Sequence, residues 1–273
     1  MSGKFRERGV TDHLRAKYHC RPVSIKALIC LDTVGSLGIP RTGIFGLFGI
    51  LVPFVKKHEF LETNMSSNVE NMCHALALQE YRKPFIPTLI YVPPERAARL
   101  QQVWFLGSHP NIGRDRETGS LADIVLAWLL QKLQDILGLR FNEVKLLIRF
   151  PRSSAAPIPV TDTRSHTWLN DPIKQSKTGI WHLMGCATRQ PGEYYQLDHV
   201  TSEYIHPTVA MRNYGVKPND PAIRGYSYHP SPEGPGYWER DRRTDTGLSM
   251  DPLRIPVAEF GALEARLLSI ALD

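Results

Sequence analysis

The sequence predicts an α/β fold with a parallel sheet, and three observations predict it. An apolar run at residues 25–31 ends in Asp32, with glycines soon after. A second apolar run at residues 103–106 ends in Gly107-Ser108-His109. Residues 120–137 have the periodicity of an amphipathic helix. Buried strands that end in polar residues are typical of α/β sheets, whose sites lie at the carboxyl ends of the strands.

The remaining elements follow from periodicity and capping residues. Ser67 and Glu70 form a capping box, and apolar residues at helical spacing follow them, so a helix is predicted there. Short apolar runs between turn residues predict strands, and polar or amphipathic stretches predict helices. In chain order we expect a helix at 5–19, a strand at 24–31, a helix at 67–80, strands at 87–92 and 102–106, a helix at 120–137, a strand at 144–150 and a helix at 257–272.

The composition changes after Pro151. Most of the 21 prolines lie in the second half, where glycine, tyrosine and arginine are also frequent. This pattern predicts an irregular cap on the sheet or a partly disordered linker. We therefore expect one unit at residues 1–150 and a proline-rich extension with a terminal helix at 151–273.

Charge and cysteine content limit the classes of function. The net charge of +6 is concentrated in residues 1–26, so no broad nucleic-acid surface is expected. This basic segment is either a solvated helix or a peripheral contact with an acidic membrane. The four cysteines form no Cys-x-x-Cys pair, and the chain shows neither an apolar signal segment nor an apolar run of about 20 residues. A cytoplasmic location is the resulting expectation.

Asp32 and His109 are the candidate catalytic residues. A carboxylate that orients an imidazole supplies two members of a nucleophilic triad. The third member, a serine in Gly-x-Ser-x-Gly, does not occur in the sequence. Ser36 and Ser108 lack the spacing of this motif, and Cys30 lies within a predicted strand. An ordinary structural role, as a turn or cap acid and a loop histidine, remains the alternative for the pair.

Two further features have functional and structural interpretations. The apolar stretch at residues 44–55 is either a buried loop and helix or a flap that contacts acyl chains. His182, Cys186, His199 and His206 match no common zinc-ligand spacing. We therefore expect no metal and no cofactor, and we assign His206 to the fold of the second half.

Residues 32–38 resemble the acid motif of an α/β-hydrolase-like family of fungi and bacteria that includes the phospholipase effectors of type VI secretion. The resemblance continues in the family's order through residues 67–71, 74–80, 85–89, 102–109 and 121–124, and residues 201–207 are similar to a later segment of the fungal members. It implies a doubly wound sheet, a Ser-Asp-His triad and cleavage of phospholipid esters. Asp32 and His109 match the acid and the histidine.

The chain departs from the family pattern near the site. Leu31 replaces a tryptophan common before the acid, and Asn111, Arg114 and Asp115 replace residues of an Asp-x-Gly-Gly-Gly loop. Only 31 residues precede Asp32, whereas the family's serine lies some tens of residues before the acid motif. These departures imply relaxed constraint, a truncated product or a wrong start codon, and we expect an N-terminally truncated fungal member.

The resulting prediction is a partial doubly wound α/β-hydrolase-like sheet with an irregular proline-rich C-terminal cap. Residues 1–150 would be the C-terminal part of the catalytic domain. The function expected is that of a phospholipase or carboxyl-esterase fragment, inactive alone, with a lipid or ester as substrate. The alternative is a non-catalytic binding or scaffold protein derived from the same fold. In either case an exposed sheet edge would permit self-association.

Overall fold

The computed structural model describes the chain in several stretches: residues 8–19, 21, 23–34, 63–113, 121–150, 158–159, 171, 173, 185–194, 197–215, 223–232, 234–243 and 249–271. Some residues considered above lie outside these stretches, namely Ser36, the apolar stretch 44–55, Arg114, Asp115 and His182.

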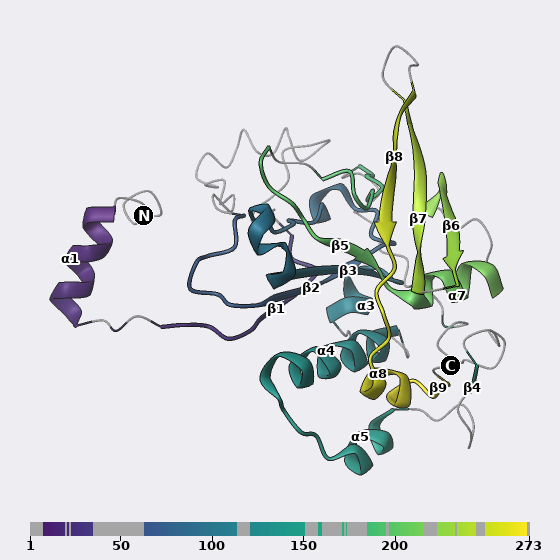
Figure 1. Cartoon of the computed structure of the whole chain (residues 1–273), viewed down its shortest axis with the longest axis horizontal. Coiled ribbons are helices and arrows are strands. Elements are labelled where there is room, and N and C mark those ends of the chain that lie inside the picture. Colours follow the sequence, from purple (N-terminus) through teal and green to yellow (C-terminus); the bar gives the residue numbers. More distant parts are fainter. Residues whose placement is uncertain are drawn as a thin grey trace, which may run out of the picture.

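Four parallel strands form the central sheet (Figure 1). They are β1 (Leu28–Leu31), β2 (Met72–Ala77), β3 (Leu100–Phe105) and β5 (Glu203–Ile205), in the order β1-β2-β3-β5. Each neighbouring pair is parallel. The predicted α/β fold class with a partial parallel sheet is therefore confirmed. The second half of the chain contributes β5 to this sheet.

The core lies between the sheet and the helix α4 (Leu121–Leu137). Every residue of β2 is buried, and β3 is buried except for partial exposure of Gln101. The rings of Phe105 and Trp128 meet edge to face with centroids 5.3 Å apart, which joins β3 to α4. Figure 1 shows α4 along one side of the sheet, with α5 (Glu143–Arg149) and α8 (Ala262–Leu267) beyond it.

Polar as well as apolar contacts dock α8 on α4. The Oε1 atom of Gln131 accepts hydrogen bonds from the backbone N–H groups of Leu263 (2.8 Å) and Glu264 (3.2 Å). These groups belong to the first turn of α8, where backbone donors have no partner within the helix. The terminal helix is shorter than predicted, because Val257 instead forms a parallel bridge with Ile205.

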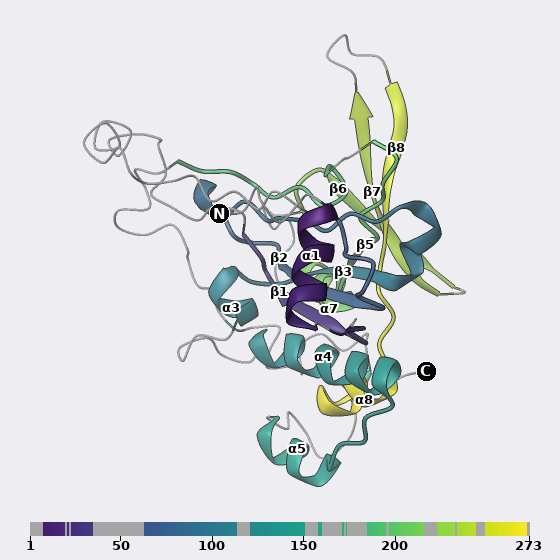
Figure 2. The same ribbon diagram turned by 90° about the vertical axis from the view of Figure 1, so that its left-hand side faces the viewer.

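The structure describes further helices outside the layer of α4, α5 and α8. They are α1 (Arg8–Tyr18), α3 (His109–Gly113), α7 (Pro207–Gly215) and the 3-10 helices η2 (Lys83–Phe85) and η3 (Pro94–Arg99). The predicted N-terminal helix is confirmed as α1, which lies apart from the sheet in Figure 1 and in front of it in Figure 2. Among the described residues, no helix combines the length and apolar character needed to cross a bilayer.

Two predicted elements have the wrong type. The segment predicted as a helix at 67–80 contains β2, and the segment predicted as a strand at 144–150 is α5. The residues of β2 are buried on both faces, so their apolar pattern does not distinguish a strand from a helix. Helix α5 begins at a cap that the prediction overlooked, because Asn142 Oδ1 accepts the Lys145 N–H at 3.1 Å. Residues 87–92, predicted as a strand, form only isolated bridges.

The C-terminal region contains a second sheet. Its high proline content had predicted an irregular structure instead. The strands β6 (Tyr226–Ser231), β7 (Gly234–Arg243) and β8 (Ser249–Pro256) are antiparallel, with β7 in the centre. Prolines are tolerated on edge strands and near strand ends, and Pro230, Pro235, Pro252 and Pro256 occupy such places. A two-stranded pairing joins β4 (Ile158–Pro159) to β9 (Ile270–Ala271).

Candidate active site

Asp32 lies directly after β1, at the carboxyl edge of the sheet. Its backbone N–H still pairs with Ala75 O on β2 (2.7 Å), but its φ of 44° turns the chain out of the strand. Aspartate adopts this left-handed conformation more readily than most residues. The turn directs the carboxylate across the end of β2, where Oδ1 accepts the Ala77 N–H at 2.8 Å. The side chain is fully buried.

His109 follows β3 by way of a tight turn. Gly107 has a φ of 112°, and a Cβ atom there would lie 2.5 Å from Asn111 Cβ, so only glycine fits. Asn111 Oδ1, in the first turn of α3, accepts the N–H of Ser108 just before the helix at 2.9 Å, as in the return bond of a capping box. The departure from the family pattern at Asn111 therefore has a structural role. The backbone N–H of His109 donates to Glu80 Oε2 at 3.3 Å.

The structure brings the two predicted residues together. Nδ1 of His109 lies 2.7 Å from Oδ2 of Asp32. An ionised carboxylate only accepts hydrogen bonds, so the hydrogen of the neutral ring is on Nδ1 and Nε2 is the basic nitrogen. The His109 side chain is 34% exposed, whereas that of Asp32 is 1% exposed. A buried acid that orients a partly open imidazole has the geometry of the acid and base of a triad.

Arg189 also contacts Asp32, and no local sequence pattern predicts this contact. Its guanidinium donates to both carboxylate oxygens, with Nη1 on Oδ1 and Nη2 on Oδ2 at 3.0 Å. Burial alone would raise the pKa of Asp32. The hydrogen bond from His109, the charge and hydrogen bonds of Arg189 and the Ala77 N–H together outweigh burial and lower that pKa to about 2. Asp32 is therefore ionised at neutral pH.

A buried histidine holds the backbone next to Asp32. His74 Nε2 accepts the Thr33 N–H at 3.1 Å, and His74 Nδ1 lies 3.0 Å from Gln102 Oε1. Burial lowers the pKa of His74, which favours the neutral ring that can accept at Nε2 and donate at Nδ1. Gln102 bonds in turn to both the N–H and the carbonyl of Ile90. This network fixes the strand end that carries the acid.

An aromatic residue supports the imidazole. The ring of Phe85 meets the ring of His109 edge to face, with centroids 5.2 Å apart. The guanidinium of Arg82 lies 3.6 Å from the centroid of Phe85, and Glu80 accepts its Nε and Nη2 hydrogens at 2.9 Å each. These contacts limit the orientations available to His109.

The other candidate residues have structural surroundings. The Ser108 hydroxyl is buried and donates to Asn111 Oδ1 at 3.0 Å. Burial raises the pKa of the Cys30 thiol, with an opposing hydrogen bond to Thr33, so this thiol is not activated. His206 is buried in the second half, where it bonds to Glu264. Within the described stretches, no group of three or more His, Cys, Asp or Glu residues has the arrangement of a metal site.

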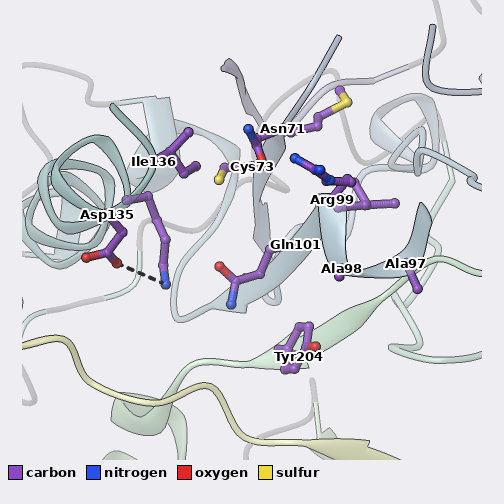
Figure 3. A pocket seen from close by; sticks show the side chains of 12 residues that line it. Asn71, Cys73, Ala97, Ala98, Arg99, Gln101, Asp135, Ile136 and Tyr204 are labelled. Atoms are coloured by element: carbon purple, nitrogen blue, oxygen red, sulfur yellow. Dashed lines mark ion pairs between the residues drawn. The ribbon is translucent and has the colours of Figure 1, made fainter. Parts of the chain in front are cut away.

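A pocket of about 230 Å³ lies at the end of the sheet where β2 and β3 begin, opposite the end that carries Asp32 and His109 (Figure 3). Its lining includes Met72 and Leu100, the first residues of β2 and β3. Lys132 Nζ lies 3.8 Å from Asp135 Oδ2. In Figure 3 Asp135 lies on the side of α4, and Arg99 lies across the pocket from it. The acid and the histidine follow the carboxyl ends of the strands, so this pocket is separate from them.

The pairing of Asp32 makes stability depend on pH. Its pKa of about 2 lies below its ordinary value of 3.8, so the interaction contributes about 2 kcal/mol above pH 3.8, and this is lost as the pH falls through about 2. We expect Asp32→Asn to reduce the loss of stability on acidification by about this amount, measured by urea unfolding at a series of pH values. Asp251→Asn, at an exposed position, should leave the pH dependence unchanged. Equal pH dependence of wild type and Asp32→Asn would contradict the prediction.

Fold and site together define a class: an α/β protein with an ionised carboxylate bonded to an imidazole at the carboxyl edge of a parallel sheet. Residues 3–132, which include Asp32 and His109, match the family model described as T6SS, Phospholipase effector Tle1-like, catalytic domain. The match supports the family predicted from the sequence, and this family suggests a lipase-like hydrolase. No curated protein and no solved structure matches the chain.

Proposed function

We propose that Asp32 and His109 are the acid and the base of an ester hydrolase site of the Ser-Asp-His type, with lipid esters as substrates. The observation that carries this proposal is the 2.7 Å contact between His109 Nδ1 and the ionised, buried carboxylate of Asp32. The match of residues 3–132 to a phospholipase effector family supports the class of substrate.

The proposed chemistry follows from the two ring nitrogens. His109 Nε2 takes the proton of a serine hydroxyl as that oxygen attacks the ester carbonyl. Asp32 stabilises the imidazolium that forms, because its carboxylate stays ionised and bonded to Nδ1–H. The imidazolium then gives its proton to the departing alcohol, and water completes the cycle with His109 again as the base.

The sequence contains no Gly-x-Ser-x-Gly, so this chain alone is expected to be inactive. Without a nucleophile no acyl-enzyme can form. Purified protein should therefore hydrolyse short acyl and phospholipid esters no faster than a His109→Ala variant, and a fluorophosphonate probe should label neither. Hydrolysis or labelling that disappears in His109→Ala would contradict the inactivity and identify a serine in this chain as the nucleophile.

The direct test of the catalytic roles uses a polypeptide that contains this chain together with a nucleophilic serine. In such a protein His109→Ala and Asp32→Asn should each lower kcat by about 10³–10⁴, while the fold is retained. Glu259→Gln, at an exposed position outside the site, is the matched control. Full activity of the Asp32→Asn or the His109→Ala variant would overturn the proposed function.

Within the part of the chain that the structure describes, β1 pairs with β2 alone, and this favours a second candidate function, that of a self-associating binding protein. Strand β1 lies at one end of the sheet order, and Leu28 and Leu31 at its two ends are 37% and 41% exposed. Ile25, which precedes the strand, is 36% exposed. Strands of parallel sheets are usually covered on both sides, and an exposed apolar edge strand readily pairs with another chain. The proposed partner is a second copy, paired edge to edge about a two-fold axis.

Self-association through β1 predicts a charge-sensitive dimer. Size-exclusion chromatography with light scattering should show wild-type protein as a dimer or larger species, and Leu28→Lys should shift it to monomer. Val144→Lys is the matched control, because Val144 is 72% exposed on α5. A wild-type chain that is monomeric at every concentration, or a Leu28→Lys dimer, would exclude this interface.

A further inference from the structure

Arg189 reaches the site from the second half of the chain, 157 residues after Asp32. The segment at residues 185–194 is bound along the chain that follows β2. The Lys83 N–H donates to Gly185 O at 3.2 Å, and the Ala187 N–H donates to Tyr81 O at 3.0 Å. This antiparallel contact places Arg189 beside the end of β1.

The guanidinium of Arg189 forms a four-point clamp. Besides the two bonds to the Asp32 carboxylate, Nη1 donates to Ala77 O at 2.7 Å and Nη2 donates to Phe85 O at 2.6 Å. The residue is 3% exposed. A planar guanidinium with fixed donor directions can orient a carboxylate in a way that a lysine ammonium cannot.

The clamp leaves the Asp32 carboxylate one orientation. Oδ1 accepts from Arg189 and from the Ala77 N–H, and Oδ2 accepts from Arg189 and lies 2.7 Å from His109 Nδ1. Rotation of the carboxylate would break bonds on both oxygens. The same guanidinium is bonded to Phe85, whose ring touches His109, so it connects both members of the pair.

We propose that Arg189 is a positioning residue, which aims the Asp32 carboxylate at His109 and thereby makes the segment at residues 185–194 part of the acid–base site. The inference rests on the proposed function for its catalytic meaning, but the orientation itself is testable in the chain without activity. A purely structural arginine would stabilise the fold without determining the bond between Asp32 and His109.

The test is NMR of the His109 ring proton on Nδ1 in ¹⁵N-histidine-labelled protein that comprises residues 1–273. Wild-type protein should show a downfield, slowly exchanging Nδ1–H resonance. Arg189→Lys keeps the positive charge but loses the planar pair of guanidinium donors. It should move the resonance upfield and speed its exchange with water about tenfold, which is the effect of one lost hydrogen bond. Arg96→Lys is the matched control, because Arg96 also donates to two backbone carbonyls but lies away from the pair.

The Asp32→Asn variant distinguishes a failure of the proposed function from a failure of the proposed role of Arg189. If it leaves the His109 resonance unchanged, the acid–histidine pairing is wrong and the proposed function fails with it. If Asp32→Asn removes the resonance and a folded Arg189→Lys variant keeps it, the positioning role of Arg189 is overturned while the pairing stands. Far-UV circular dichroism establishes folding of each variant.

If the Arg189→Lys variant does not fold, a second measurement on wild-type protein still tests the proposal. A clamped guanidinium should show separate resonances for its Nη protons, because the four hydrogen bonds stop rotation about the C–N bonds. A single averaged Nη signal for Arg189 in wild-type protein would overturn the proposal.

Discussion

Replacing Trp104 with alanine should lower the free energy of unfolding by about 3–5 kcal/mol. The side chain is fully buried in β3, so its removal leaves a cavity at the centre of the sheet. It also removes a donor, because Trp104 Nε1 bonds to Glu203 Oε2 at 2.8 Å. Burial raises the pKa of Glu203 against the opposing hydrogen bonds, so this carboxyl group depends on its donors. Urea unfolding followed by far-UV circular dichroism measures the loss.

Two further variants separate the causes. Trp104→Phe keeps an aromatic ring but lacks the N–H, so its cost should be smaller, about 1–3 kcal/mol. Leu197→Ala changes a side chain that is 70% exposed and should alter stability by less than about 0.5 kcal/mol. If Trp104→Ala costs no more than Leu197→Ala, Trp104 does not anchor the sheet.

Replacing Glu264 with alanine should cost about 3 kcal/mol, because it leaves the buried Nε2 of His206 without its hydrogen-bond partner. Glu264 Oε1 lies 2.7 Å from His206 Nε2, and both side chains are at most 1% exposed. The other nitrogen, Nδ1, lies 2.8 Å from Thr208 Oγ1. The His206 ring also stacks on Phe105 at 4.5 Å, so this pair ties α8 to β3.

Thermal and urea unfolding of Glu264→Ala, compared with Glu259→Ala, test this role. Glu259 is exposed only a few residues earlier, and its replacement should change stability by less than about 0.5 kcal/mol. Glu264→Gln retains an oxygen that can accept from His206 and should lose less than Glu264→Ala. Equal stability of the two alanine variants would show that the buried pair contributes nothing net, as some buried pairs do.

The parts of the fold that could be predicted are those with local signals. The run before Asp32, the run before His109 and the periodicity of α4 each identify an element within a few residues. Strand β2 could not be predicted, because burial on both faces removes the alternation that marks a strand. The sheet β6–β8 could not be predicted because its prolines argue against strands. They lie on edge strands or near strand ends, where they do not interrupt the hydrogen bonds between strands.

The candidate site divides in the same way. Asp32 and His109 stand at strand ends, which local sequence reveals, and they lie in contact. Arg189 lies in a stretch without regular structure, and nothing in its neighbourhood indicates a partner 157 residues away. His74 and Gln102 lie inside strands, where a polar residue signals a buried network only once the neighbouring strand is known.

The distance along the chain between Asp32 and Arg189 also affects synthesis. Ribosomes add about 5–20 residues per second, so the acid emerges roughly 8–30 s before the arginine that neutralises it. During that interval, burial of the end of β1 would leave a carboxylate in the interior without its main counter-charge, which is costly. The end of β1 that carries Asp32 should therefore become buried only after residue 189 has left the ribosome. The first half of the chain then cannot finish folding until the second half has been synthesised.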